Sequence, residues 1–503
     1  MEQADLILTS FLATISNPLT MFMVLIGTFM GLVFGALPGL TATMAVALLI
    51  PITYSLDAVT AIGMMIGAYV GGIAGGAVSA TLLNIPGTPS AVVTTLDGYP
   101  MAKQGRGAEA LGWAAFSSGY GSLISWLALV LLAPMLAEFC VGFAPPEYAA
   151  LAFFGLTIIS AVSGKSILKG LVAGMVGMSL GFDGLDPIWG DLRFTFDNMN
   201  LMGGVSIMPA LIGLYSIPQI LLGCTEKNVV KNISLKLTNF IPSLSKMWAN
   251  KMNIIRSSII GTIIGIIPAT GGNIASFMAY DQAKRFSKDP DSYGKGNHEG
   301  VIASEAANNG VCGGALIPML TLGIPGDSVT AVLLGGLLIH GLTPGPAMFV
   351  EHYDVVIGIF TTMLVATIFM VLLQVVGIRI FVKVLTVPIN YLSAALVVLS
   401  IVGSYALRAN MFDVGLTIVL GIFGYFMARA DFPVAPTVLG LVLGEMFERE
   451  FRLALRLSDG SMSIFFTRPI SLVIVLLAFV IILSNVPWVA NMMKRFRNRK
   501  IEA

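Results

Sequence analysis

The chain has 503 residues, of which 56% are hydrophobic and 11% are charged, and its formal net charge is +1. Soluble domains carry about 25% charged residues, so this composition excludes an ordinary soluble protein and indicates a polytopic membrane protein. The near-zero net charge excludes a basic nucleic-acid-binding surface as the main function, and the three scattered cysteines form neither a disulfide framework nor a metal cluster.

The first hundred residues predict a hairpin followed by a broken helix. An apolar run from Asn17 to Leu37 stops at Pro38-Gly39, and the next run, Leu40 to Thr53, is too short to cross a hydrocarbon core of about 30 Å. We therefore expect the two runs to form a re-entrant hairpin, which enters the membrane and returns. The following segment, Ala58 to Leu83, crosses the membrane and breaks at Pro86-Gly87.

The middle of the chain predicts further spans and then a cationic segment. The spans are Leu111 to Leu136, Tyr148 to Val162, Ile167 to Leu180 and Gly203 to Leu222. An acidic loop with Asp183, Asp186, Asp191 and Asp197 separates the last two and is expected on the non-cytoplasmic side. The cationic segment carries Lys227, Lys231, Lys236, Lys246 and Lys251, so the positive-inside rule places it in the cytoplasm.

The opening pattern then recurs. Ile254 to Ile267 and Ile274 to Ala283 flank the break of a second hairpin, Pro268 to Asn273, and Val301 to Leu342 is interrupted at Pro325-Gly326. Both Ile-Pro-Gly breaks follow a Gly-Gly-Ala run, at Gly75 and at Gly313, so the chain is predicted to be internally duplicated. The second hairpin has cations on both flanks and the first has none, which predicts that the two halves are inverted, as in many secondary transporters.

The last third predicts five more spans. They are Val355 to Val375, Ile389 to Tyr405, Val414 to Ala428, Val434 to Phe447 and Ile470 to Val489. The basic tail after them predicts a cytoplasmic C-terminus.

The predicted fold is all-α and polytopic, with two inverted structural repeats, re-entrant hairpins and broken helices, as in elevator-like transporters. The predicted organisation is a first repeat at residues 1–110, connecting helices at 111–223, a cytoplasmic linker at 224–253, a second repeat at 254–346 and C-terminal helices at 347–503.

Several stretches resemble one transporter family in their order along the chain. They are Gly27 to Met44, Asn84 to Gly87, Leu96 to Lys103, Glu305 to Asn309, Leu322 to Gly336, and His340 to Pro346. In these stretches the sequence resembles the large membrane subunit, of the TctA type, of the tripartite tricarboxylate transporters. The last third adds mostly hydrophobicity to the resemblance.

The resemblance implies a symporter in the bacterial inner membrane that imports an organic carboxylate with an ion gradient. It also implies a small partner membrane subunit and a periplasmic solute-binding protein. We expect sodium as the coupling ion, no other cofactor, lipid contacts, and a dimer of the membrane complex.

A substrate with two or three carboxylates needs compensating charge in the membrane, yet few Lys or Arg residues fall within the spans. Helix N-termini can supply it, because they offer unpaired amides and about half a positive charge. The predicted substrate-binding residues lie at the four breaks: Thr41, Ala42, Thr43, Asn84, Gly87, Thr88, Ser90, Thr270, Gly271, Gly272, Asn273, Gly326, Asp327, Ser328 and Thr330. The predicted cation-binding residues are Asn84, Glu305, Asn308, Asn309 and Asp327.

Some of these residues have a structural alternative. Asp327 suits a helix N-cap as well as a cation ligand or proton acceptor, and Glu305 suits a partly solvated helix-end charge as well as an ion ligand. The hydroxyls of Thr41, Thr43 and Ser90 suit bonds to backbone in a glycine-rich interface. His340 suits an interface better than a proton relay.

Three other functions fit the sequence less well. A self-sufficient sodium-coupled carboxylate carrier would share the broken hairpins but would need no partner. An intramembrane aspartyl protease is disfavoured, because the proline motif at Pro209 precedes Asp281 and Asp327, and Ile324 replaces the glycine required before the Asp327 motif. A passive channel is disfavoured by the lack of a repeated filter loop.

Overall fold

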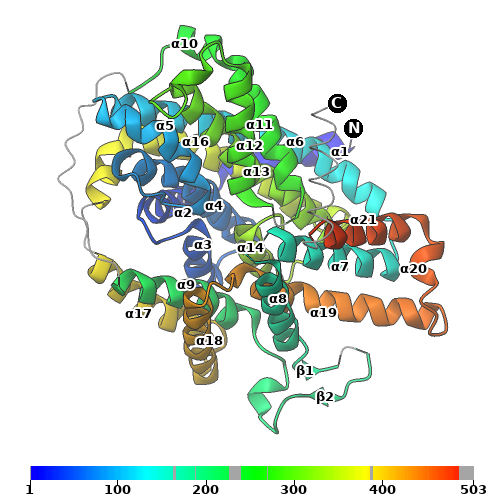
Figure 1. The fold of residues 1–503 in the computed structure, drawn as a ribbon. Helices are drawn as coiled ribbons and strands as arrows, with labels where there is room; N and C mark the ends of the chain where they lie inside the picture. The colour runs from blue at the N-terminus through cyan, green and yellow to red at the C-terminus, as the bar shows by residue number, and fades with distance from the viewer. Residues whose placement is uncertain are drawn as a thin grey trace. The chain divides into compact units, whose positions relative to one another are not determined.

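The computed structural model describes residues 2–162, 166–186, 188–225, 240–268, 270–385 and 389–485, and these residues are mostly helical (Figure 1). Within these described ranges, five helices are long and apolar enough to cross a membrane: α2 (Pro18–Ala36), α4 (Ala58–Leu83), α6 (Gly107–Cys140), α16 (Tyr353–Val384) and α18 (Met411–Arg429). The prediction of an all-α membrane protein is confirmed at this level.

The remaining helices are shorter or less apolar. In the first part of the chain they are α1 (Glu2–Ser16), α3 (Ala42–Thr53), η1 (Pro89–Ala91), α5 (Val92–Lys103), α7 (Pro145–Val162), α8 (Ile167–Gly181), η2 (Met199–Leu201), α9 (Ile207–Thr225) and α10 (Leu244–Ala249). In the second part they are α11 (Lys251–Ile266), α12 (Gly271–Phe286), η3 (Pro290–Ser292), α13 (His298–Leu322), α14 (Ser328–Ile339), α15 (Met348–Glu351), α17 (Ile389–Arg408), α19 (Val434–Leu457), α20 (Ile464–Thr467) and α21 (Pro469–Asn485).

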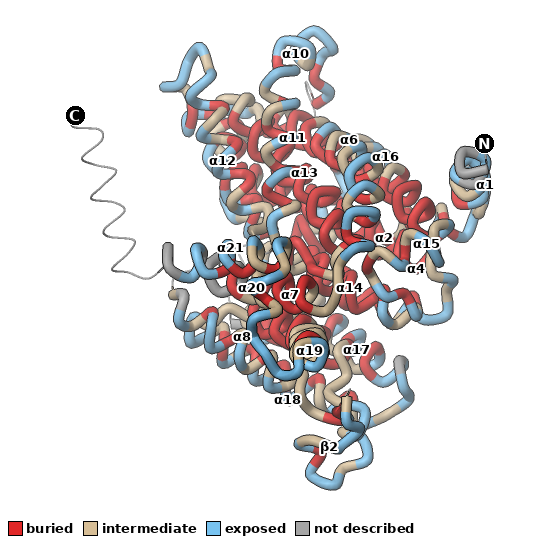
Figure 2. Tube along the Cα trace, turned by 90° about the vertical axis from the view of Figure 1, so that its right-hand side faces the viewer, coloured by how far each residue is buried: buried red, intermediate tan, exposed pale blue. Residues whose placement is uncertain are grey.

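The chain divides into two compact units. The first unit contains Met1–Val141 and Leu211–Tyr425, and the second contains Gly142–Ala210 and Phe426–Ala503. Both predicted hairpins and both predicted helix breaks fall in the first unit. Its helix α13 is buried from Gly300 to Thr321 (Figure 2).

The hairpin and break positions follow from local backbone chemistry. Helix α2 ends at Ala36, just before Pro38, and Gly39 turns the chain with a φ of 85°. Thr41 is the N-cap of α3, and its hydroxyl accepts a hydrogen bond of 3.2 Å from the amide of Met44. Helix α13 ends at Leu322, because Gly323 adopts a left-handed φ of 69° just before the second Ile-Pro-Gly break.

Each hairpin packs on a long helix through glycines. A Cβ added to Gly31 or Gly35 of α2 would overlap the carbonyl oxygens of Ala68 and Gly72 on α4. The glycines Gly261 and Gly265 of α11 meet the carbonyl oxygens of Ala307 and Val311 on α13 in the same order. Glycine lets two backbones approach this closely, so the hairpin tips are fixed beside α4 and α13.

Some elements differ from the sequence prediction. Helix α1 precedes the first predicted span, and the acidic loop contains a two-stranded antiparallel sheet of β1 (Gly184–Leu185) and β2 (Leu192–Arg193). The strands have two residues each, which is too few to show a periodic pattern in the sequence. Lys227, Lys231 and Lys236 of the predicted linker lie outside the described residues. Lys246 lies 3.8 Å from Glu109.

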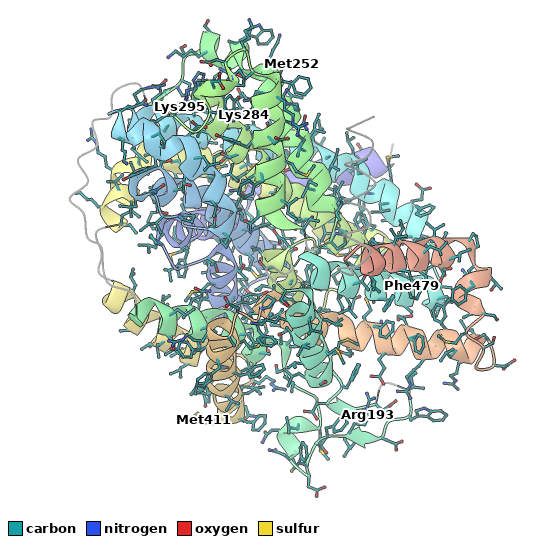
Figure 3. All side chains as sticks on the ribbon, in the orientation of Figure 1. Arg193, Met252, Lys284, Lys295, Met411 and Phe479 are labelled. Atoms are coloured by element: carbon teal, nitrogen blue, oxygen red, sulfur yellow. The ribbon has the colours of Figure 1, made fainter. Side chains whose placement is uncertain are left out.

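In the second unit, charged side chains fasten the acidic loop, where Figure 3 labels Arg193, to α19 through ion pairs. Arg193 donates two hydrogen bonds to Glu448, at 2.6 and 3.1 Å, and Arg452 donates one of 2.6 Å to Asp186. The pKa of Asp186 is held well below its usual range, first by the Arg452 hydrogen bond and then by the backbone amide of Trp189.

The lowered pKa of Asp186 predicts how the loop responds to acid. A carboxylate with a depressed folded pKa stabilises the fold above its unfolded pKa of about 3.9, and the contribution is lost as the pH falls through the folded value. We expect the wild-type loop to resist pepsin to below pH ~4 for this reason, and Arg452→Met to lose that resistance at a higher pH. Arg449→Met is the control, because Arg449 pairs with Glu450. Identical pepsin profiles for the two variants would contradict the prediction.

Candidate substrate and ion site

The two hairpin tips and the two helix breaks of the first unit pair crosswise. Thr43, in the first hairpin, lies with its hydroxyl 3.2 Å from that of Ser328, in the second break. A Cβ added to Gly272, at the tip of the second hairpin, would lie 2.8 Å from the Cβ of Ser90, in the first break. Each hairpin tip therefore lies against the break in the other half of the chain.

Both breaks rest on the glycine-rich ends of a hairpin helix. A Cβ on Gly87 would overlap the carbonyl oxygen of Gly35 and lie 2.6 Å from the hydroxyl of Ser79. A Cβ on Gly326 would lie 2.6 Å from the carbonyl oxygen of Gly265 and 2.6 Å from the Cα of Ala315. The two breaks therefore use equivalent contacts, and neither glycine has room for a side chain.

Asp327 caps the second break. Its Oδ1 accepts hydrogen bonds from the amides of Val329 and Thr330, at 3.0 and 2.8 Å, and the Thr330 hydroxyl completes a capping box. The N-cap interpretation of Asp327 is confirmed. Its Oδ2 also accepts a hydrogen bond of 2.6 Å from the hydroxyl of Tyr69, so the cap is tied to the middle of α4.

Glu305, Asn308 and Asn309 form a buried polar row on α13. Glu305 is 0% exposed and accepts hydrogen bonds from the hydroxyls of Thr94 on α5 and Ser118 on α6. The alternative of a partly solvated helix-end charge is therefore wrong, because α5 and α6 cover this turn of α13. The sequence does not show that α5 packs against the turn of α13 that carries Glu305.

The two asparagines have unused hydrogen-bonding capacity. The amide nitrogen of Asn309 donates to the carbonyl oxygen of Val70 at 3.3 Å and to Ser122 at 3.2 Å. Among the described residues, the side-chain oxygens of Asn308 and Asn309 have no hydrogen-bond partner, although the two residues are 1% and 0% exposed. A Cβ on Gly272 would lie 2.6 Å from the Asn308 oxygen. Buried polar atoms are nearly always paired, so the pair marks the row as a candidate ligand site.

The other predicted substrate-binding residues differ from one another in burial and in hydrogen bonding. Thr88 and Ser90 are buried together, with their hydroxyls 3.2 Å apart. The Thr270 hydroxyl donates to the carbonyl oxygens of Ile264 and Ile267, at 2.5 and 2.6 Å, and so caps α11. Asn84 and Asn273 are exposed, and Asn84 holds the left-handed conformation at the end of α4. The hairpin tips contain Thr41, Ala42 and Gly271. The binding role of all the residues in this paragraph stays a prediction.

A model of the tripartite tricarboxylate transporter TctA family matches residues 21–439. The chain belongs to the TctA family. It is 36% identical over 478 residues to an uncharacterized 52.8 kDa protein in the TAR-I ttuC' 3' region of Agrobacterium vitis, which covers 93% of this chain and 94% of the relative. It is 38% identical over 211 residues to an uncharacterized protein in the TAR-II ttuC' 3' region of the same organism, covering 42% of this chain and 87% of that relative. No solved structure matches the chain.

TctA membership makes the chain a multi-pass membrane subunit of a tripartite transporter, and a tripartite system implies partner subunits. A transporter family also fits the expectation that the chain is not an enzyme. The resemblance drawn from the sequence motifs is confirmed, and the match extends beyond them into the last third of the chain.

The structure also adds residues that the sequence analysis did not single out. Tyr69, Thr94 and Ser118 hold the two buried carboxylates of this TctA site, Asp327 and Glu305. Tyr69 stands out in the sequence as a phenol within an apolar span, but nothing in the sequence pairs it with Asp327. Asp97 lies within the family motif Leu96 to Lys103, and nothing else in the sequence distinguishes it.

Asp97 fastens α5 to the loop between α12 and α13. Its Oδ1 accepts hydrogen bonds from the amides of Gly294, Gly296 and Asn297, at 2.9, 2.9 and 2.8 Å, and its Oδ2 accepts one of 2.7 Å from Tyr280 on α12. Asp97 itself is 0% exposed. This carboxylate therefore joins the first broken helix to the second hairpin, the two elements that meet at Ser90 and Gly272.

Removing the Asp97 carboxylate is expected to destabilise the TctA fold. Asp97→Ala leaves the buried amide of Gly296 unpaired and removes three part-buried hydrogen bonds, so we expect a total loss of about 3 kcal/mol. Tyr280→Phe removes one hydrogen bond and should cost about 1–2 kcal/mol. Thermal unfolding of the purified chain measures both, with Thr95→Ala on the same helix as the control. Equal stability of Asp97→Ala and Thr95→Ala would contradict the prediction.

Asp327→Asn separates the two roles of Asp327. Asparagine also caps helices, so the unfolding temperature should fall by only a few degrees, about 1 kcal/mol. A cation ligand or proton acceptor, in contrast, needs the charge, so uptake by the variant should change its dependence on sodium or pH. Uptake measured across both gradients tests this. Unaltered dependence on sodium and pH would show that Asp327 acts only as the N-cap of α14.

Proposed function

We propose that this TctA chain is the large transmembrane subunit of a secondary transporter that imports di- or tricarboxylates with a sodium gradient. A soluble binding protein delivers the substrate, and a small membrane subunit completes the complex. The proposal places the chain in the bacterial inner membrane with a cytoplasmic C-terminus. Its broken hairpins work as two inverted repeats, and the equivalent glycine contacts of α2 and α11 support this.

The crosswise pairing of hairpin tips and helix breaks carries the proposal. The pairing gathers the starts of α3, α12 and α14 around α4 and α13. Helix starts carry partial positive charge, which suits carboxylate groups. Thr41 and Asp327 already accept hydrogen bonds from amides of α3 and α14, whereas Thr270 makes no side-chain cap to α12. Because such breaks are tolerated in the membrane only inside protein or beside a water-filled cavity, they are suited to holding a solute at this depth.

The charges of the described residues support recognition by backbone rather than by basic side chains. The buried charged side chains among them are all carboxylates: Asp97, Glu147, Asp186, Glu305, Asp327 and Asp413. An anionic substrate next to Glu305 and Asp327 would be repelled unless cations accompanied it. Glu305 with the free amide oxygens of Asn308 and Asn309 offers oxygen ligands for such a cation. This arrangement supports cotransport with a cation, for which we propose sodium.

Reconstituted uptake tests the proposal. The chain and its small membrane partner are placed in liposomes, and uptake of radiolabelled di- and tricarboxylates is measured with and without a sodium gradient and the binding protein. We expect uptake only when both are present. Uptake by this chain alone would instead identify a self-sufficient carrier, and uptake independent of any gradient would reject ion coupling.

A further inference from the structure

The loop at residues 182–206 of the second unit exposes large apolar side chains on irregular backbone. This is the acidic loop described above, which we call the β1–β2 loop from here on; residue 187 lies outside the described residues. Phe196 is 84% exposed, Met199 81%, Trp189 69% and Phe194 64%. The loop extends beyond α8 of its own unit (Figure 1). Exposed apolar side chains concentrated in one loop mark an interaction site.

The backbone of the loop is held in a shape that points these side chains outward. Phe194, Phe196 and Asp197 have φ values of 54°, 50° and 56°, a left-handed conformation that bulky residues rarely adopt. Thr195, between the two phenylalanines, is 7% exposed and anchors the segment. The ion pairs of Arg193 with Glu448 and of Arg452 with Asp186 fix the base of the loop to α19. A contact surface fixed in advance loses less entropy on binding.

Lipid does not account for this exposure. Irregular backbone exposed to lipid does not occur within the hydrocarbon layer, because its amides and carbonyls would be unpaired. At the headgroup level, the exposed carboxylates of Asp191 and Asp197 would gain nothing from lipid headgroups of the kind that attract basic residues. A second copy of the same loop would bring these carboxylates against each other.

We infer that the β1–β2 loop is the docking surface for the soluble binding protein that delivers the carboxylate, an inference that rests on the proposed function. The partner surface would be an apolar depression that receives Phe196 and Met199, with Lys and Arg residues at its rim facing Asp191 and Asp197. Aromatic residues and methionine are enriched at protein interfaces. Complementary charge at the rim speeds association and fixes orientation. The loop also lies on the side that the sequence predicts to be non-cytoplasmic.

Binding of the purified binding protein to the full membrane complex in nanodiscs tests this inference. Phe196→Ser combined with Met199→Ser should weaken the Kd at least tenfold. Asp191→Lys combined with Asp197→Lys should slow association and reduce its dependence on salt. The matched controls are Trp248→Ser and Phe286→Ser, because these aromatics are 71% and 70% exposed elsewhere in the chain. Wild-type binding by both loop variants would overturn the inference, and loss of binding in the controls would do so too.

A polarity-sensitive fluorophore attached to the Met199→Cys variant distinguishes docking of the binding protein from contact with the membrane surface or with a second copy of the chain. A blue shift on adding the binding protein supports docking. A blue shift on moving from detergent into nanodiscs alone identifies the membrane surface, and a shift that grows with the concentration of the complex in detergent identifies a second copy. Either of these results overturns the inference.

The binding assay does not depend on transport, so the two proposals fail separately. If the wild-type complex takes up no carboxylate under any gradient, the proposed function fails. If wild-type uptake requires the binding protein and the loop variants bind it and transport normally, only the docking inference fails.

Discussion

Gly87→Ala and Gly326→Ala are each expected to reduce carboxylate uptake at least tenfold. The added methyl group of Gly326→Ala would lie 2.6 Å from both the carbonyl oxygen of Gly265 and the Cα of Ala315, and that of Gly87→Ala would overlap the carbonyl oxygen of Gly35. These neighbours are backbone atoms, so the break itself must move. Overpacking of this kind costs about 1–3 kcal/mol, and the displaced helix start would no longer face the opposite hairpin tip.

Gly415→Ala is the matched control for this prediction. Gly415 lies in α18, and a Cβ there would have no neighbour within 4 Å, so alanine should preserve uptake and even favour the helix slightly. Initial uptake rates in proteoliposomes measure the effect, and gel filtration verifies that each variant remains folded. Replacing Pro325-Gly326 by Ala-Leu should abolish uptake. Wild-type rates for Gly87→Ala and Gly326→Ala would show that the breaks do not form the transport site.

Glu305→Gln is expected to uncouple transport from the ion gradient. The Glu305 carboxylate is fully buried, and its partners are the neutral hydroxyls of Thr94 and Ser118. A buried charge without a counterion is unfavourable by several kcal/mol or more, so a cation or proton must accompany it during the cycle. Glutamine keeps the size of the side chain but removes the charge. Uptake should therefore fall at least tenfold, and the remaining uptake should not respond to sodium or pH gradients.

Two variants separate this coupling role from a packing role. Thr94→Val removes a hydroxyl that contacts Glu305 and leaves the carboxylate, so its uptake should decrease but stay dependent on the gradient. Glu299→Gln, in the first turn of the same helix, should leave coupling unchanged, because Glu299 binds the hydroxyls of Ser287 and Tyr293 instead. Full gradient dependence in Glu305→Gln would reject the coupling role.

The sequence by itself determined the family, the membrane class and the positions of the helix breaks. Proline and glycine act through local backbone geometry, so Pro38-Gly39, Pro86-Gly87 and Pro325-Gly326 could be placed without knowledge of their neighbours. The Asp327 cap is local for the same reason, because its amide partners lie two and three residues along the chain.

Only the tertiary structure decided which of these pieces meet. Thr43 with Ser328, Tyr69 with Asp327, and Asp97 with the amides of Gly294, Gly296 and Asn297 are pairs that join segments far apart in the chain. No periodicity in one segment encodes such a pairing, because it arises when helices pack through their small residues. For that reason the burial of Glu305 and the exposure of Asn84 and Asn273 could not be foreseen, whereas the residues that break the helices could.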